Sequence, residues 1–438
     1  MGGELFFWSE FMKIKIIEKN YEEVLALPKQ KHIKPWKQQV LFRKLIQLLS
    51  CVELWRTGFK CEKVGMDKLG ADEPCLVLMN HSSFIDLKIA YTLLSDRSFN
   101  TVCTSDGFVG KNLLMRLIGC IPTKKFISDP NLIRDMMYIV KDLKSSVLMY
   151  PEASYSFDGT ATPLPDSIGR LTKMLGVPVV MITTYGAFAR DPLYNGLRIR
   201  KVKVSAKMEC VLSAAELKTK SAAEIQSILE ECFAFDNFRW QQENQVRIKE
   251  KFRAEGLNRV LYKCPHCKTE GKMVGKNTII VCKECGKRYE LTEYGFMRAL
   301  GGETEFNHIP DWYSWERQCV KDELLAGTYK LHVPVDICVM VNTKCVYRVG
   351  SGELTHTAEG FHLTGCDGKI DYRQKPMSSY SLYSDYFWYE VGDVICIGDN
   401  NMLYYCFPKN SGDIVAKTRL ATEELYKLAK RKKKHENS

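Results

Sequence analysis

The sequence predicts an α/β protein in which a mixed, largely parallel sheet with N-terminal helices is followed by two smaller β-rich segments. Short apolar runs alternate with helical patterns between residues 75 and 208, an order that is typical of parallel sheets covered by helices. Two Cys-x2-Cys motifs follow between residues 264 and 285, a spacing typical of small metal-binding hairpins. From residue 329 onward, short β-like runs are separated by Gly-Asp-Asn turns, which predicts a small barrel or sandwich.

Composition agrees with a folded protein of several domains. The chain has 438 residues, of which 45% are hydrophobic and 26% charged, and this length allows about three domains. The 17 cysteines are odd in number and scattered, which favours a reducing cytosol over a disulfide scaffold. We find no secretory signal and no run of the roughly 18 apolar residues needed to span a bilayer.

We expect residues 1–64 to form an N-terminal amphipathic, helical region. Pro35 precedes a helical pattern from Trp36 to about Trp55, with leucines at helical spacing. This apolar stripe could pack on the core or lie on a membrane. The formal net charge of +11 and the basic end of the chain (residues 427–435) would favour an anionic membrane surface by roughly 1 kcal/mol per basic residue, although such a tail can also be merely solvated.

The α/β core is expected over residues 65–258. Its predicted strands are residues 75–79, 101–104, 146–150, 177–183 and 202–208, and its predicted helices are residues 86–94, 111–117, 131–143 and 167–175. A capping box at Ser221–Glu224 predicts a further helix, and another is expected from Asn237 to Ala254, ended by Gly256.

Asn80-His81-Ser82-Ser83-Phe84-Ile85-Asp86 directly follows the first predicted strand. We expect Asn80 and one of the two serines to cap the next helix, which places His81 at the turn and Asp86 about one turn later. A carboxylate there can fix the imidazole tautomer and leave the other nitrogen free to accept a proton from a hydroxyl. The pattern therefore favours a general base, although a His-Asp pair can also serve stability alone.

Three further blocks follow in order: residues 119–125 (GCIPTKK), 150–156 (YPEASYS) and 177–181 (VPVVM). Together with the His81 block, they resemble the four blocks of the glycerophospholipid acyltransferase superfamily, typified by bacterial 1-acylglycerol-3-phosphate acyltransferases. The resemblance covers about residues 65 to 190. It implies an O-acyltransferase of phospholipid biosynthesis, with His81 as catalytic base and Asp86 as the residue that orients it.

The resemblance also implies the substrates and the residues that bind them. The donor would be an acyl-CoA or acyl-carrier-protein thioester, attacked directly by the hydroxyl of a lysophospholipid. Lys125, or else Lys124, stands where the second block usually has an arginine for the acceptor phosphate, and Glu152 and Ser154 belong to the third block's acceptor site. That block usually continues glycine-threonine-arginine after the glutamate, whereas this chain has Ala153-Ser154-Tyr155. Without the arginine, which binds phosphate through two hydrogen bonds, the sequence does not determine which lysophospholipid is the acceptor.

Residues 259–292 are predicted to form a zinc ribbon. Cys264 and Cys267 make one knuckle, and Cys282 and Cys285 make the other after fourteen intervening residues. Four thiolates complete a tetrahedral shell, so we expect a structural Zn²⁺ with no open position for catalysis. His266 is expected to be a neighbour of the metal and not a ligand.

Residues 293–438 are expected to form a β-rich module with a terminal helix from Thr422 to about Lys433. Its architecture weakly resembles a pleckstrin-homology-like module. Strands are predicted at residues 336–341, 345–349, 360–363, 386–390, 394–398 and 402–407.

We therefore predict a zinc-containing acyltransferase that is cytoplasmic and peripheral on the inner face of the cell membrane. Its partners would be an acyl thioester, a lysophospholipid and the membrane surface. The alternative is a catalytically degenerate, membrane-associated binding or scaffold protein. Nucleic acid is not an expected partner, because the basic residues are dispersed and no stacking platform is evident.

Overall fold

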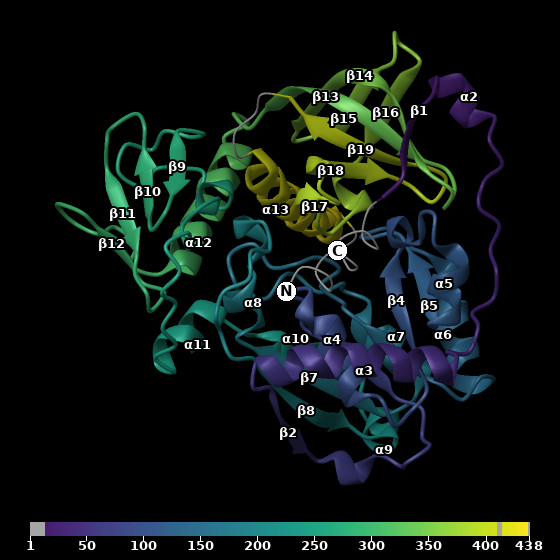
Figure 1. Cartoon of the computed structure of the whole chain (residues 1–438). Coiled ribbons are helices and arrows are strands. Elements are labelled where there is room, and N and C mark those ends of the chain that lie inside the picture. The colour runs from purple at the N-terminus through teal and green to yellow at the C-terminus, as the bar shows by residue number, and fades with distance from the viewer. Residues whose placement is uncertain (1–13, 410–413, 437–438) are drawn as a thin grey trace.

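The computed structural model describes residues 14–409 and 414–436 (Figure 1). Its central layer is a seven-stranded sheet in the order β2-β8-β7-β3-β6-β4-β5. The strands are β2 (Lys60–Val64), β3 (Leu76–Met79), β4 (Phe99–Thr104), β5 (Cys120–Thr123), β6 (Ser146–Met149), β7 (Val179–Tyr185) and β8 (Ser205–Leu212). All neighbours are parallel except β7 and β8. The expected mixed, largely parallel sheet is therefore confirmed.

Helices cover both faces of this sheet, because alternate side chains of its central strands point to opposite faces. Val77 lies in one buried cluster with residues of α4 (Ile85–Leu93). Leu76 and Leu78 lie in another cluster, with residues of α6 (Pro130–Lys141), α7 (Ile168–Leu175) and α10 (Ala222–Phe233). The long α3 (Val40–Arg56) packs against α4, and α5 (Asn112–Leu117) lies beside β5.

The cysteine segment forms its own antiparallel sheet in the order β12-β11-β10-β9. Its strands are β9 (Met273–Lys276), β10 (Ile279–Cys282), β11 (Arg288–Leu291) and β12 (Met297–Ala299). The following helix, α12 (Ile309–Leu325), is joined to it because the Trp312 indole donates a hydrogen bond to the Lys263 carbonyl (3.0 Å).

The C-terminal region is β-rich, as expected. Seven of its strands lie in the order β16-β15-β14-β13-β19-β18-β17, and β1 (Ile16–Glu18) adds a parallel partner to β14. These strands are β13 (Leu331–Met340), β14 (Val346–Thr357), β15 (Gly360–Gly365), β16 (Ile370–Gln374), β17 (Tyr383–Trp388), β18 (Gly392–Gly398) and β19 (Leu403–Pro408). The last helix, α13 (Ile414–Glu436), packs on α12 and β17 and lies between this sheet and the core (Figure 1).

Several sequence-based bounds differ from the structure. The helix expected from Asn237 to Ala254 is wrong in length, because α11 ends at Glu243 and Gln245 has a positive φ of 51°, outside the helical region. Strands β1, β2, β5 and β16 were not predicted, and β1 lies in the N-terminal region that we expected to be helical. Helix α13 begins eight residues before the predicted Thr422. The remaining short elements are α2 (Tyr21–Leu25), α8 (Ala187–Arg190), α9 (Ala214–Thr219), and the 3-10 turns η1 (Met66–Lys68), η2 (Ser105–Phe108), η3 (Leu193–Asn195), η4 (Leu257–Arg259) and η5 (Pro376–Ser378).

No helix among the described residues has both the length and the apolar character required to cross a membrane.

Candidate active site and cysteine cluster

The turn between β3 and α4 is held by the Asp86 carboxylate. Its Oδ2 accepts hydrogen bonds from the backbone N–H groups of Ser82 (2.7 Å) and Ser83 (2.9 Å), and the side chain is fully buried. Asp86 thus satisfies two amides at the start of α4, and Ser83 Oγ accepts a hydrogen bond from the backbone N–H of Ile85 (3.2 Å), as expected for one of the two serines. Asn80 instead accepts a hydrogen bond from the backbone N–H of Thr184 (2.8 Å) and so ties β3 to β7. The expectation for Asn80 was wrong because a buried partner strand competes for its amide.

Asp86 also faces the imidazole of His81. The distance from His81 Nδ1 to Asp86 Oδ2 is 3.4 Å, and the histidine side chain is 22% exposed. The ring lies between two tyrosines, Tyr150 and Tyr155, with each ring centroid 4.2 Å away. Since Nδ1 faces the carboxylate, Nε2 lies on the side of the ring away from Asp86. The His81 ring lines a large cavity.

Burial controls the charge state of this imidazole. It lowers the pKa of His81 below 6.5, and this effect outweighs the opposing influence of Asp86. The ring is therefore neutral at pH 7, which is the state that a proton acceptor needs.

Glu152 contacts the backbone of His81 and not its ring. Its carboxylate accepts hydrogen bonds from the backbone N–H groups of His81 (2.9 Å) and Thr162 (2.7 Å). The side chain is buried, and burial raises the pKa of Glu152 to about 7. Glu152 does not line the cavity. It joins the third sequence block to the first, as a support for the histidine turn.

Lys125 and Lys124 both reach the cavity, but in different surroundings. Lys124 donates hydrogen bonds to backbone carbonyls of the turn after β18, those of Asp399 (3.4 Å) and Asn400. Lys125 lies over the ring of Tyr383, with Nζ 4.4 Å from its centroid. Burial lowers the pKa of Lys125. Of the two lysines, Lys125 is therefore the one whose ammonium is not engaged by the turn.

Ser154 is buried and does not line the cavity. Its Oγ accepts a hydrogen bond from the guanidinium of Arg419 on α13 (2.9 Å). That arginine also stacks over Phe157, with its guanidinium carbon 4.4 Å from the ring centroid. The third block has no arginine of its own, but it is hydrogen-bonded to Arg419 from the C-terminal helix.

The cavity beside His81 has a volume of about 1100 Å³. One wall comes from the α/β core and includes Lys125 and Tyr155, and a second wall comes from β17 and the turn that follows it, including Tyr383, Asp385 and Tyr389. Sequence reasoning missed this second wall. Its residues lie more than two hundred positions from His81, and no local motif marks them.

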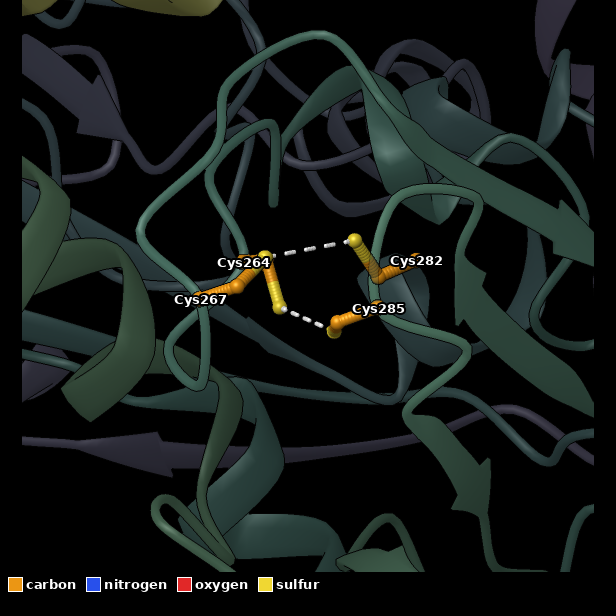
Figure 2. A group of neighbouring side chains, drawn as sticks. All are labelled: Cys264, Cys267, Cys282 and Cys285. Atoms are coloured by element: carbon orange, nitrogen blue, oxygen red, sulfur yellow. Dashed lines mark hydrogen bonds between the residues drawn. The ribbon is translucent and has the colours of Figure 1, made fainter.

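The predicted metal-binding cysteines come together as a compact group (Figure 2). The sulfur atoms of Cys264, Cys267, Cys282 and Cys285 all lie within 4.8 Å of one another. The Cys264–Cys285 and Cys267–Cys282 sulfur pairs are 3.8 and 3.7 Å apart. A tetrahedral ion with metal–sulfur bonds of about 2.3 Å requires sulfur separations of about 3.8 Å. The group therefore has the dimensions of a four-cysteine metal site. His266 lies outside it, with Nδ1 3.2 Å from Glu305.

Comparison with known proteins identifies the region that carries the histidine site. Residues 37–184 match the sequence model of the family described as Acyltransferase. A chloroplastic 1-acyl-sn-glycerol-3-phosphate acyltransferase of Brassica napus, BAT2, is 32% identical over 134 residues, which is 29% of this chain and 38% of that protein. The chain thus spans less than two-fifths of that relative's length. The crystal structure of the 1-acyl-sn-glycerophosphate acyltransferase PlsC from Thermotoga maritima aligns with 43% of this chain and 76% of its own, at 16% identity and a TM-score of 0.35.

His81, Asp86, Lys125, Glu152 and Ser154 all lie within residues 37–184, the segment that matches the Acyltransferase family model. The cysteine cluster and the C-terminal strands lie outside residues 37–184.

Proposed function

We propose that this protein transfers a fatty acyl group from an acyl-CoA or acyl-carrier-protein thioester to the hydroxyl of a lysophospholipid. The observation that carries the proposal is the His81 ring, which faces Asp86 through Nδ1 and lines a large cavity. The match of residues 37–184 to the acyltransferase family supports it.

In the proposed mechanism, Nε2 of His81 takes the proton of the acceptor hydroxyl while that oxygen attacks the thioester carbonyl. The tetrahedral adduct then expels the thiolate, and the imidazolium returns the proton to sulfur. Asp86 fixes the tautomer and stabilises the transient imidazolium. Glu152 acts indirectly, by holding the backbone N–H of His81.

Incubation of the full chain with a labelled acyl thioester and a panel of lysolipids tests the proposal. We expect acylated products by mass spectrometry, and we expect His81→Ala to reduce the rate by roughly 10²- to 10⁴-fold. The matched control is His332→Ala, because His332 is an exposed histidine on β13 far from the cavity. Product formation by His81→Ala at the wild-type rate would contradict the proposed base.

A binding or scaffold role is the second candidate. Its motivation is Tyr155, which takes the place of the usual arginine and stacks on the His81 ring. Binding of lysolipid without turnover of any thioester would support this role.

We also propose that the four cysteines hold one structural zinc ion. Thiolates at these separations suit zinc, which needs four sulfur ligands and no open position in a structural site. The ion would join the two knuckles that flank β9 and β10 and would take no part in acyl transfer.

Peripheral attachment to the cytoplasmic face of the cell membrane is the third part of the proposal. Helix α3 carries an apolar stripe that no other described element covers: Leu41, Leu48 and Trp55 are 77%, 65% and 83% exposed, and they lie seven residues apart on one face. Such a stripe with basic neighbours suits a lipid surface. Replacing Leu41 and Leu48 by Asp should abolish sedimentation with anionic vesicles, whereas Leu325→Asp, at an exposed leucine of α12, should not.

A further inference from the structure

The acceptor end of the cavity is built from two distant parts of the chain. The core supplies Lys125, and β17 supplies Asp385 together with the aromatic rings around it. A shift of strand register between Asp385 and Trp388 marks a β-bulge, and Phe387 has a positive φ of 58°. Bulges of this kind re-aim side chains next to binding sites. Strand β17 is therefore both the edge strand of its sheet and part of the lining of the cavity.

Asp385 is a half-buried carboxylate that no cationic side chain of the described residues contacts. Its Oδ1 is buried and makes no hydrogen bond, which is uncommon for a native carboxylate. Lys125 acts on Asp385 only through their electrostatic attraction, and no ion pair within 4.0 Å joins the two in the described part of the chain. Burial raises the pKa of Asp385 to about 6. The Lys125 ammonium and the Asp385 carboxylate therefore line the same cavity without forming an ion pair with each other.

Aromatic rings line the cavity on the side of Asp385. They are Tyr383, Tyr386, Phe387, Trp388 and Tyr389. Lys125 already lies over the Tyr383 ring, and Arg259 lies over the Tyr386 and Phe387 rings. The faces of such rings attract cations, and an aromatic set with a carboxylate is the usual recognition site for alkylammonium groups.

The charge balance of the cavity disfavours a phosphate monoester. Three cationic side chains (Lys124, Lys125 and Arg170) and four acidic ones (Asp129, Asp166, Asp385 and Glu390) line it. A phosphate monoester carries about −1.5 to −2 charges near pH 7, and tight recognition calls for an arginine fork. The lining has one arginine, Arg170, which is exposed, and it is Tyr155, not an arginine, that lies beside the His81 ring.

We infer that the acceptor is a zwitterionic lysophospholipid whose phosphate diester lies at Lys125 and whose ammonium lies at Asp385 among the β17 aromatic rings. This inference rests on the proposed acyl transfer and names its substrate class. A single lysine matches the single negative charge of a diester, and the carboxylate that lacks an ion pair matches the ammonium. Asp385 is then a specificity-determining residue contributed by the C-terminal module.

The test compares acceptors that share one acyl chain and differ only in headgroup. Lysophosphatidylcholine, lysophosphatidylethanolamine, lysophosphatidylglycerol and lysophosphatidic acid are offered to the full chain with one acyl thioester. We expect kcat/KM for the two zwitterionic acceptors to exceed that for lysophosphatidic acid at least tenfold. Asp385→Asn should reduce this ratio about tenfold, by lowering the rate with zwitterions and raising it with lysophosphatidic acid. Asp336→Asn is the matched control, since Asp336 lies on β13 of the same module and pairs with Lys409 outside the cavity.

A binding measurement separates this inference from the proposed function. Calorimetric titration of the full chain with dodecylphosphocholine and with dodecyl phosphate should show preference for the first, and Asp385→Asn should remove it. Preferential binding without turnover of any acceptor would overturn the acyltransferase and retain the headgroup site. Turnover that favours lysophosphatidic acid, or a headgroup ratio unaffected by Asp385→Asn, would overturn the inference and retain the acyltransferase.

Discussion

The His81 site and the cysteine cluster are built in opposite ways. The four cysteines lie within 22 residues of sequence, in two knuckles that flank one hairpin. The cavity beside His81 combines the β3–α4 turn, the third block and the β17 wall, which span about 300 residues. A local cluster depends on a few short turns, whereas the cavity depends on the packing of the C-terminal module onto the core. Loss of the proposed zinc should therefore affect stability, and changes around His81 should affect the proposed acyl transfer.

The largest effect that we expect comes from loss of the metal ligands. Cys282→Ser should prevent binding of the proposed zinc ion, and such an ion contributes about 10 kcal/mol or more in isolated zinc-binding peptides. We expect elemental analysis to give about one zinc per wild-type chain and little in the variant, and hydrogen exchange to accelerate across residues 263–300. The control is Cys319→Ser, because Cys319 is a half-buried thiol outside the cluster. If the β3–α4 turn lost protection to the same extent, the two sites would not be independent.

The next effect concerns Asp86. Asp86→Asn should lower kcat by roughly 10²- to 10⁴-fold, because the amide cannot stabilise an imidazolium. The carboxylate raises the pKa of His81, so its removal should lower that pKa further. In the proposed mechanism, activity requires the neutral ring and is gained as pH rises through the pKa of His81. We expect the acidic limb of the wild-type pH profile to lie below pH 6.5, and the limb of the variant to lie lower still. A limb that moved upward would contradict an orienting role for Asp86.

Local patterns predicted much of this molecule. The spacing of the two Cys-x2-Cys motifs was enough to predict that the four cysteines lie together. Short apolar runs were enough to predict the strands of residues 76–79 and 146–149. Asp385 and Arg419 could not be predicted as neighbours of the site, because nothing near them in sequence indicates which surface the C-terminal module covers. The same limit applies to Ser154: its block placed it beside the acceptor, while the structure shows its hydroxyl bonded to Arg419 of α13.

Ser154→Ala measures how firmly that module is held. The change leaves one N–H of a buried guanidinium unpaired, so we expect the free energy of unfolding to fall by about 1–3 kcal/mol. Chemical denaturation measures the loss, and Ser227→Ala, at an exposed serine of α10, is the control. A raised KM for the acceptor with unchanged stability would instead support the substrate-binding role that the sequence suggested.

The smallest expected effect lies in backbone strain that both sites share. Ala153, directly after Glu152, has a positive φ of 56°. The acyltransferase block that this segment resembles usually has glycine at that position. The two knuckles have Lys268 (φ 66°) and Gly286 (φ 74°) directly after their second cysteines. A residue with a side chain is destabilised by roughly 1–2 kcal/mol in this backbone conformation. Replacement by glycine relieves that strain, but part of the gain is lost because glycine increases the entropy of the unfolded chain. Ala153→Gly should therefore raise the free energy of unfolding by up to about 1 kcal/mol.

Lys268→Gly is the matched change in the first knuckle, and it should gain less. It relieves the same backbone conformation but removes the hydrogen bond from Nζ to the Pro265 carbonyl (2.6 Å) and the contact with the Trp315 ring, whose centroid lies 4.7 Å from Nζ. Chemical denaturation of the two variants compares the sites on one scale. A larger gain at Lys268 than at Ala153 would mean that the cysteine segment bears the greater strain and that the loop beside His81 accommodates its alanine without cost.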